Sequence, residues 1–125
     1  MVEKIEWSEF LRGNLIHYYH TFAPTANAVT NLLSAGEHPA MRFIKGTVIA
    51  RVHDTTAPQM NIEDGDGNTI TATATASTTV HTAVSFTAGT DLVIYSQEAL
   101  KVEVTTAGGA NAMVDLNLTF EIYDE

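Results

Sequence analysis

Strict alternation of apolar and polar residues in the last quarter of this chain is the strongest constraint on its fold. Apolar residues occupy every second position from Val114 to Ile122, and Leu100, Val102 and Val104 show the same pattern shortly before. Successive side chains of a β-strand point to opposite faces, so this period indicates strands with one face on a core and one in solvent. The pattern predicts an all-β protein, folded as an antiparallel β-sandwich.

Turn signals divide the chain into about eight predicted strands, spaced as in a jelly-roll-like sandwich. The predicted strands are Leu15–Phe22, Arg42–His53, Gln59–Glu63, Thr69–Ala76, Val80–Phe86, Leu92–Tyr95, Leu100–Thr105 and Val114–Ile122. The segment from Thr25 to Ala40 fits either a helical turn or a short strand ending at Gly36. The segment from Thr106 to Asn111 is expected to form a hairpin loop between the last two strands.

The longest predicted strand, Arg42–His53, is interrupted by Gly46. Glycine inside a strand weakens it and often marks a β-bulge, so a bulge is predicted at Gly46. Alternation along this strand also predicts which side chains face the core. These are Ile44, Val48, Ala50 and Val52.

The segment from Glu63 to Asn68 is the strongest turn signal in the chain, because its Asp-Gly and Gly-Asn pairs adopt positive φ at little cost. Its Asp64, Asp66 and Asn68 also resemble the start of a calcium-binding loop. An EF-hand loop requires glycine at its sixth position and glutamate at its twelfth, and threonine occupies both positions here. A β-turn is the preferred interpretation, and calcium binding is the alternative.

Composition limits the kinds of partner this protein can have. The 125 residues suit one domain, with residues 1–13 as an N-terminal arm and 14–125 as the β-sandwich. A net charge of −9 opposes binding to nucleic acid. No apolar run is long enough for a membrane span, and the N-terminus lacks the apolar region of a secretory signal. The absence of cysteine excludes disulfides and thiol chemistry.

The sequence has no pattern typical of a catalytic or cofactor site. His17 and His20 are three apart in a predicted strand, so they project from opposite faces and cannot share a metal ion. The remaining histidines stand alone near turns or strand ends, and there is no nucleophile elbow or phosphate-binding glycine loop. The protein is therefore predicted to be a non-enzyme without cofactor or metal.

Two features of the sequence suggest an interaction surface instead. Tyr18 and Tyr19 are adjacent in one strand, so one ring must lie at a sheet edge or an interface. The segment from Thr69 to Thr79 is an uncharged Thr/Ala ribbon of high β-propensity, and such a strand is an aggregation hazard when exposed. The ribbon is predicted to be central in its sheet or covered by a partner. Its candidate partner-binding residues are Thr71, Thr73 and Thr75.

The N-terminal arm, residues 1–13, contains the single tryptophan, Trp7, together with Phe10 and Leu11. One interpretation is that Trp7 closes one end of the sandwich. The other is that the arm anchors on a neighbouring subunit, because aromatic residues are favoured interface anchors. Trp7, Phe10 and Leu11 are the candidate partner-binding residues of the arm.

The order of motifs is similar to that of small β-sandwich structural proteins of tailed-bacteriophage virions. In those proteins a strand, a Gly-Asp-rich turn, a Thr-rich strand and a final hairpin follow in this order. The matching segments, which extend over roughly residues 42 to 123, are Gly46-Thr-Val-Ile-Ala-Arg-Val52, Ile62-Glu-Asp-Gly-Asp-Gly-Asn-Thr-Ile70, Val84-Ser-Phe-Thr-Ala-Gly-Thr-Asp-Leu92 and Leu100-Lys-Val-Glu-Val-Thr-Thr-Ala-Gly-Gly109.

This resemblance implies a capsid decoration (cement) protein or a head-fibre protein. Such a protein lies on the outer surface of the capsid, binds the major capsid protein, clamps neighbouring subunits and is commonly a homotrimer. The alternative is a glycan-binding or tail-associated module that uses Tyr18, Tyr19 or Tyr95 as a stacking platform.

Overall fold

The computed structural model describes residues 14–123. These residues contain nine strands and no helix, so the prediction of an all-β fold is confirmed. The strands are β1 (Leu15–Phe22), β2 (Val29–Leu33), β3 (Met41–Val52), β4 (Gln59–Glu63), β5 (Ala74–Thr75), β6 (Ala83–Ser85), β7 (Val93–Ile94), β8 (Leu100–Thr106) and β9 (Met113–Ile122).

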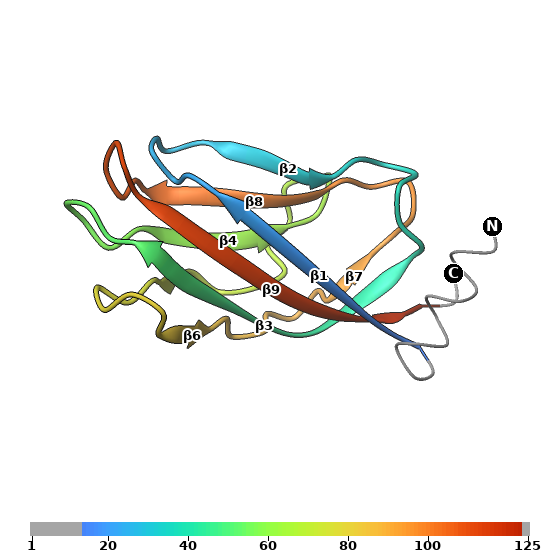
Figure 1. The fold of residues 1–125 in the computed structure, drawn as a ribbon. Coiled ribbons are helices and arrows are strands. Elements are labelled where there is room, and N and C mark those ends of the chain that lie inside the picture. Colours follow the sequence, from blue (N-terminus) through green and yellow to red (C-terminus); the bar gives the residue numbers. More distant parts are fainter. Residues whose placement is uncertain (1–13, 124–125) are drawn as a thin grey trace.

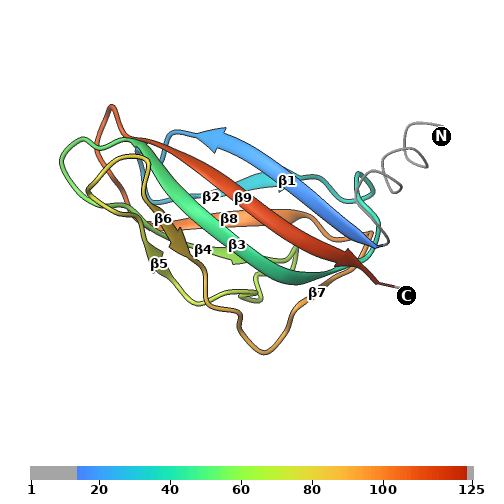
Figure 2. The ribbon, with the colours of Figure 1, turned by 60° about the horizontal axis from the view of Figure 1, so that its bottom comes forward.

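The strands form two antiparallel sheets packed face to face (Figures 1 and 2). One, the β9 sheet, has the order β1-β9-β3-β6, with β7 also pairing with β3. The other, the β8 sheet, has the order β2-β8-β4-β5. Chain neighbours occupy the same place in the two orders: β1 with β2, β9 with β8, β3 with β4, and β6 with β5. This arrangement is that of an eight-stranded jelly roll, to which β7 is an addition.

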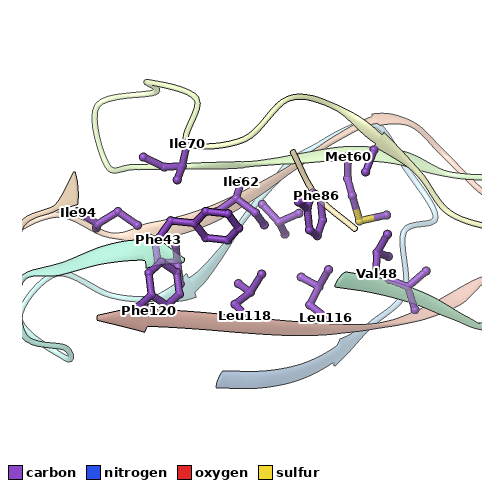
Figure 3. Close-up of a cluster of buried hydrophobic side chains, with 14 of the residues drawn as sticks. Phe43, Val48, Met60, Ile62, Ile70, Phe86, Ile94, Leu116, Leu118 and Phe120 are labelled. Carbon is purple, nitrogen blue, oxygen red and sulfur yellow. The ribbon is translucent and has the colours of Figure 1, made fainter. Parts of the chain in front are cut away.

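The core between the sheets is built from the alternating residues that the sequence pattern identified. Val114, Leu116, Leu118 and Phe120 of β9 are buried, and Ile62 of the β8 sheet is among the residues that pack against them (Figure 3). The Phe120 ring meets those of Phe43 and Tyr18 edge to face, with centroids 5.8 and 5.9 Å apart. Burial of one such large side chain contributes about 1.5–3 kcal/mol, so the core rather than any single polar contact holds the sheets together.

Strand β3 differs from the prediction in which side chains it buries. Val48 and Ala50 face the core as expected, but Ile44 and Val52 are 43% and 40% exposed. The pairing register with β9 shifts between Phe43 and Lys45, and again between Ala50 and Val52. A shift of one residue moves a side chain to the other face of the sheet. The prediction was therefore wrong at the two ends of the strand, and the first irregularity lies just before Gly46 rather than at it.

The structure shows how two connecting segments fold. The segment from Thr25 to Ala40 contains the strand β2, and it ends at Leu33, a few residues before Gly36. The loop from Thr106 to Asn111 was wrongly predicted as a hairpin, because β8 and β9 belong to different sheets. A turn-rich sequence shows that the chain changes direction, but it does not show which sheet the next strand joins.

The Thr/Ala ribbon is less regular than predicted. Only Ala74–Thr75 forms a strand, and β5 lies at the edge of the β8 sheet, so the prediction of a central position was wrong. Thr71 is buried and Ala72 is exposed, so the alanines of the ribbon do not all lie on its inner face. The cause is local: the Thr71 hydroxyl accepts a hydrogen bond from the Ile62 backbone N–H, 3.1 Å away, and this holds its side chain inside.

Candidate functional site

The outer face of the β9 sheet is the best-organised polar surface among the described residues. Antiparallel pairing of β1 with β9 sets His17 opposite Thr119, and Thr21 opposite Asp115. These cross-strand pairs bond directly: His17 Nδ1 lies 2.8 Å from Thr119 Oγ1, and the Thr21 hydroxyl donates to Asp115 Oδ1 at 2.6 Å. The face is thus tied together by side-chain bonds between strands that are far apart in sequence.

A four-residue cluster, Tyr19, Thr21, Arg51 and Asp115, lies at one end of this face. The Arg51 guanidinium donates to Asp115 Oδ2 from Nε and Nη2, at 3.2 and 3.1 Å. Arg51 Nη2 also donates to the Tyr19 hydroxyl at 2.9 Å. Tyr19 is 59% exposed, so the cluster presents an aromatic ring to solvent over a fixed ion pair.

Ionisation of Asp115 is favoured by its neighbours. Desolvation acts to raise the pKa of this carboxyl, but hydrogen bonds from Thr21, Arg51 and Tyr19 and the Arg51 charge outweigh it, and the pKa lies below its ordinary value of 3.8. The hydrogen bond and charge of Asp115, and after them Tyr19, raise the pKa of Arg51. Both groups therefore stay charged at neutral pH, and the cluster is an ion pair rather than a proton-transfer site.

A shallow hollow of about 210 Å³ lies on the same sheet, where β3, β6 and β9 adjoin. Hydroxyl and amide groups line much of it, which suits hydrogen bonding to a polar surface. The lining residues are Lys45, Gly46, Thr47, Ser85, Phe86, Asn117 and Thr119.

Charge is distributed unevenly over the molecule. The strands of the β9 sheet carry three cations, Arg42, Lys45 and Arg51, against two anions, Asp115 and Glu121. Arg42 and Glu121 form an ion pair, as do Arg51 and Asp115. This sheet is therefore close to neutral in a chain of net charge −9.

The acidic groups gather on the β8 sheet and its loops. Burial raises the pKa of Glu63, and the adjacent Glu103 carboxyl raises it further. Burial likewise raises the pKa of Glu98, and the nearby Asp66 and Asp64 carboxyls raise it further. These clustered carboxylates repel any other acidic surface. An acidic partner is therefore better accommodated by the β9 sheet than by the β8 sheet.

The predicted tyrosines lie on opposite faces of β1. Tyr18 points inward against Phe120, and burial raises the pKa of its hydroxyl to about 12. Tyr19 points outward into the cluster with Arg51. Tyr95 is exposed elsewhere, edge to face with Tyr123 at 6.2 Å between ring centroids. The three tyrosines named in the glycan-binding alternative thus have different surroundings and share no platform.

The other predicted site residues are separated from this face. Thr73 and Thr75 are exposed beside the edge of the β8 sheet, whereas Thr71 lies inside the subunit. Trp7, Phe10 and Leu11 lie outside the described residues, so their predicted role in partner binding stays a prediction.

The Asp64 segment forms the predicted β-turn. Asp64 Oδ1 accepts from the backbone N–H groups of Asp66 and Asn68, each at 2.9 Å, and Gly67 adopts a φ of +85°. The carboxylate is thus used to close the turn, which confirms the preferred interpretation. Among residues 14–123, no group of three or more His, Asp or Glu side chains is placed to hold a metal ion.

Sequence reasoning missed the Arg51–Asp115 cluster, because residues 64 positions apart meet only through the β3–β9 register. A detectable signal was also overlooked: no charged side chain occurs between Asn14 and Gly36, the segment that contains β1 and β2.

Comparisons with protein-family models and with curated proteins find no match for this chain. A helix long and apolar enough to cross a membrane is not found in the described part of the chain.

Proposed function

We propose that this chain is a non-enzymatic structural protein of a bacteriophage virion, a decoration protein that binds the outer surface of the capsid and clamps neighbouring capsid subunits. The observation that carries the proposal is the jelly-roll strand order, a fold found among viral capsid and lectin domains. The similarity of the Gly46–Gly109 motifs to phage structural proteins supports the same class.

The architecture suits attachment to a repeating lattice. Two sheets filled with apolar side chains form a stiff scaffold, and the near-neutral β9 sheet supplies a broad face with hydroxyl, amide and paired charged groups. On a symmetric shell the same modest contact is repeated many times. Any linkage between copies then increases retention through effective concentration rather than through strong single contacts.

Attachment is assigned to the arm and the outer face together. Trp7, Phe10 and Leu11 of the arm are the proposed anchors, since buried aromatic residues dominate interface energies. Tyr19 on the β9 sheet, and Thr73 with Thr75 beside the β8 sheet, are the proposed accessory contacts. The homotrimer implied by the resemblance stays a prediction.

The test is binding to undecorated shells of the phage that encodes the chain, followed by co-sedimentation. Replacing Trp7 and Phe10 together by alanine should lower shell occupancy at least about tenfold, the loss of roughly 1.4 kcal/mol or more. The melting temperature should stay that of the wild type, since the anchors act on a partner. Val80→Ala, which removes an exposed apolar side chain elsewhere, is the matched control.

Two outcomes would refute the assignment. Shell occupancy unchanged in the double variant would remove the arm from the contact, and failure of the wild type to bind shells would remove the proposed function. Loss of folding in the double variant would place Trp7 in the core, which was the other interpretation of the arm.

The second candidate is a glycan-binding module, favoured by the exposed Tyr95–Tyr123 pair. Aromatic faces stack on sugar rings, and lectins are among the jelly-roll proteins. A glycan array gives the decision: a hit that Tyr95→Ala abolishes would favour this function, and a blank array would exclude it for the sugars presented.

A further inference from the structure

Of the four sheet edges, the one formed by β1 lacks the features that usually prevent pairing with another chain. Natural proteins blunt sheet edges by making the strands short, bulged or charged. The edge strands β5 and β6 contain two and three residues, and the pairing of β2 with β8 is broken by a register shift. Strand β1 runs for eight residues with unbroken register against β9 (Figure 2).

The pairing with β9 determines which backbone groups of β1 are unused. The Ile122 N–H donates to the Asn14 carbonyl, so the residue pairs that exchange hydrogen bonds are Asn14 with Ile122 and then every second pair. The intervening residues direct their N–H and C=O groups away from β9. They are Leu15, His17, Tyr19 and Thr21.

The free edge is therefore a row of four donors and four acceptors. Within residues 14–123, no hydrogen bond reaches the outward backbone groups of these residues. We define this row as the β1 edge.

The side of the sandwich around the β1 edge is also uncharged. From Asn14 to Gly36 there is no Asp, Glu, Lys or Arg, although the chain carries a net charge of −9. The nearest charged groups on the β9 sheet are already paired, as in Arg51 with Asp115. Two copies that approach through this side avoid the like-charge repulsion that the acidic β8 sheet would produce.

An apolar crevice of about 130 Å³ opens on the same side, between β1 and the β8 sheet. Burial of such apolar surface against a partner is favourable, because it removes that surface from water. Most of the lining of the crevice is leucine, contributed by Leu32, Leu33, Leu100, Leu116 and Leu118.

We propose that the β1 edge pairs with the β1 edge of a second copy, antiparallel and about a two-fold axis, so that two β9 sheets become one continuous sheet. An antiparallel strand is complementary to its own copy, because each donor row meets an identical acceptor row, and the contact closes after two chains. Since the free groups belong to Leu15, His17, Tyr19 and Thr21, these residues must oppose one another. All four are matched when the two-fold axis passes through Tyr18.

With the axis at Tyr18, all four residues of each copy find partners, and about eight backbone hydrogen bonds form. Leu15 then lies opposite Thr21 of the second copy, and His17 opposite Tyr19. The two crevices come to lie on either side of the joint. This pairing does not depend on capsid binding and goes beyond it, since it concerns the free protein, for which it predicts a dimer in place of the homotrimer that the resemblance implies.

The test combines mass with amide exchange on the full chain. Light scattering should give about 27 kDa at high concentration, twice the mass of the 13.5 kDa chain. As concentration rises from about 1 µM to about 1 mM, the amides of His17, Tyr19 and Thr21 should become at least about tenfold slower to exchange. Amides that already bond to β9, such as those of Ile16 and Tyr18, should change little.

A charged edge residue should prevent the pairing. His17→Lys places a cation on each edge and should raise the dimer dissociation constant at least about tenfold. His17→Leu removes the same bond to Thr119 without adding charge, and it should leave the dimer intact. Thr90→Lys, in an exposed loop away from β1, makes the same change in charge and should leave the dimer intact.

Each contrary result overturns the proposal. A monomer at about 1 mM would do so, as would a trimer near 40 kDa whose outward β1 amides exchange freely. A monomer with these amides protected at every concentration would show that another segment of the same chain occupies the edge. A dimer that His17→Lys leaves intact would form through a different surface.

Discussion

Removal of the Asp115 carboxylate tests whether the polar cluster on the β9 sheet stabilises the fold. In Asp115→Ala, the Thr21 hydroxyl loses an acceptor at 2.6 Å, and Arg51 loses one at 3.1 Å. A hydrogen bond to a charged group contributes about 1.5–3 kcal/mol when it is shielded from water, and the Asp115 side chain is only 12% exposed. The Arg51 side chain is 49% exposed, so solvent screens its ion pair and the contribution of this pair is the smaller one.

We therefore expect Asp115→Ala to lower the free energy of unfolding by about 2–3 kcal/mol, and Arg51→Met to lower it by less. Urea unfolding followed by circular dichroism measures both. In double-mutant cycles the coupling of Thr21 to Asp115 should exceed that of Arg51 to Asp115. Asp91→Ala, which removes a carboxylate from an exposed loop, is the matched control and should stay within about 0.5 kcal/mol of the wild type.

The loss of stability in Asp115→Ala should depend on pH. The pKa of Asp115 is lowered in the fold from its ordinary value of 3.8, so its contribution is fully present above that value and is lost as pH falls through the folded pKa. The gap between wild type and Asp115→Ala should be constant near neutrality and should narrow in acid. A loss below about 0.5 kcal/mol, or a larger effect of Arg51→Met than of Thr21→Val, would refute the reasoning.

Two further changes test packing and charge elsewhere. Gly46→Ala should lower the free energy of unfolding by about 1–3 kcal/mol, because a Cβ there would lie 2.7 Å from Leu118 Cδ2 and 3.1 Å from the Asn117 carbonyl oxygen; an unchanged urea midpoint would contradict this. Glu63→Gln should stabilise the protein by about 0.5–1 kcal/mol at neutral pH, because the raised pKa of Glu63 means that its ionised form opposes folding. This gain in stability should shrink as the pH is lowered toward the pKa of Glu63. Thermal unfolding across the pH range measures it, and a variant less stable than wild type at neutral pH would be the contrary result.

The predictions from sequence succeeded where a strand obeys one register throughout. Alternation identified the apolar core residues of β9, Val114, Leu116, Leu118 and Phe120, because the pairing with β1 is regular from Val114 to Glu121. It failed at Ile44 and Val52, where shifts against β9 reverse the face that a residue presents. Periodicity is a local property, whereas a bulge is fixed by the partner strand, which one sequence does not reveal.

The candidate site was less predictable than the core for a related reason. The arm and the Thr/Ala ribbon are predicted as partner-binding segments from their local composition alone. The cluster that the structure reveals joins Tyr19, Arg51 and Asp115 from three strands. Such a site requires the order β1-β9-β3 and the register of two pairings, neither of which follows from residue types alone.

Charge and edge geometry together explain why one side of the sandwich is the natural place for self-association. Net negative charge keeps copies of a protein apart, and here the excess anions lie on the β8 sheet and in loops, as with Glu63, Glu98 and Glu103. The segment from Asn14 to Gly36 contributes nothing to that repulsion. It also contains the only sheet edge within the described part of the chain that is both long and regular. A contact there gains backbone hydrogen bonds and covers an apolar crevice, yet leaves the outer face of the β9 sheet and its cluster open to a different partner.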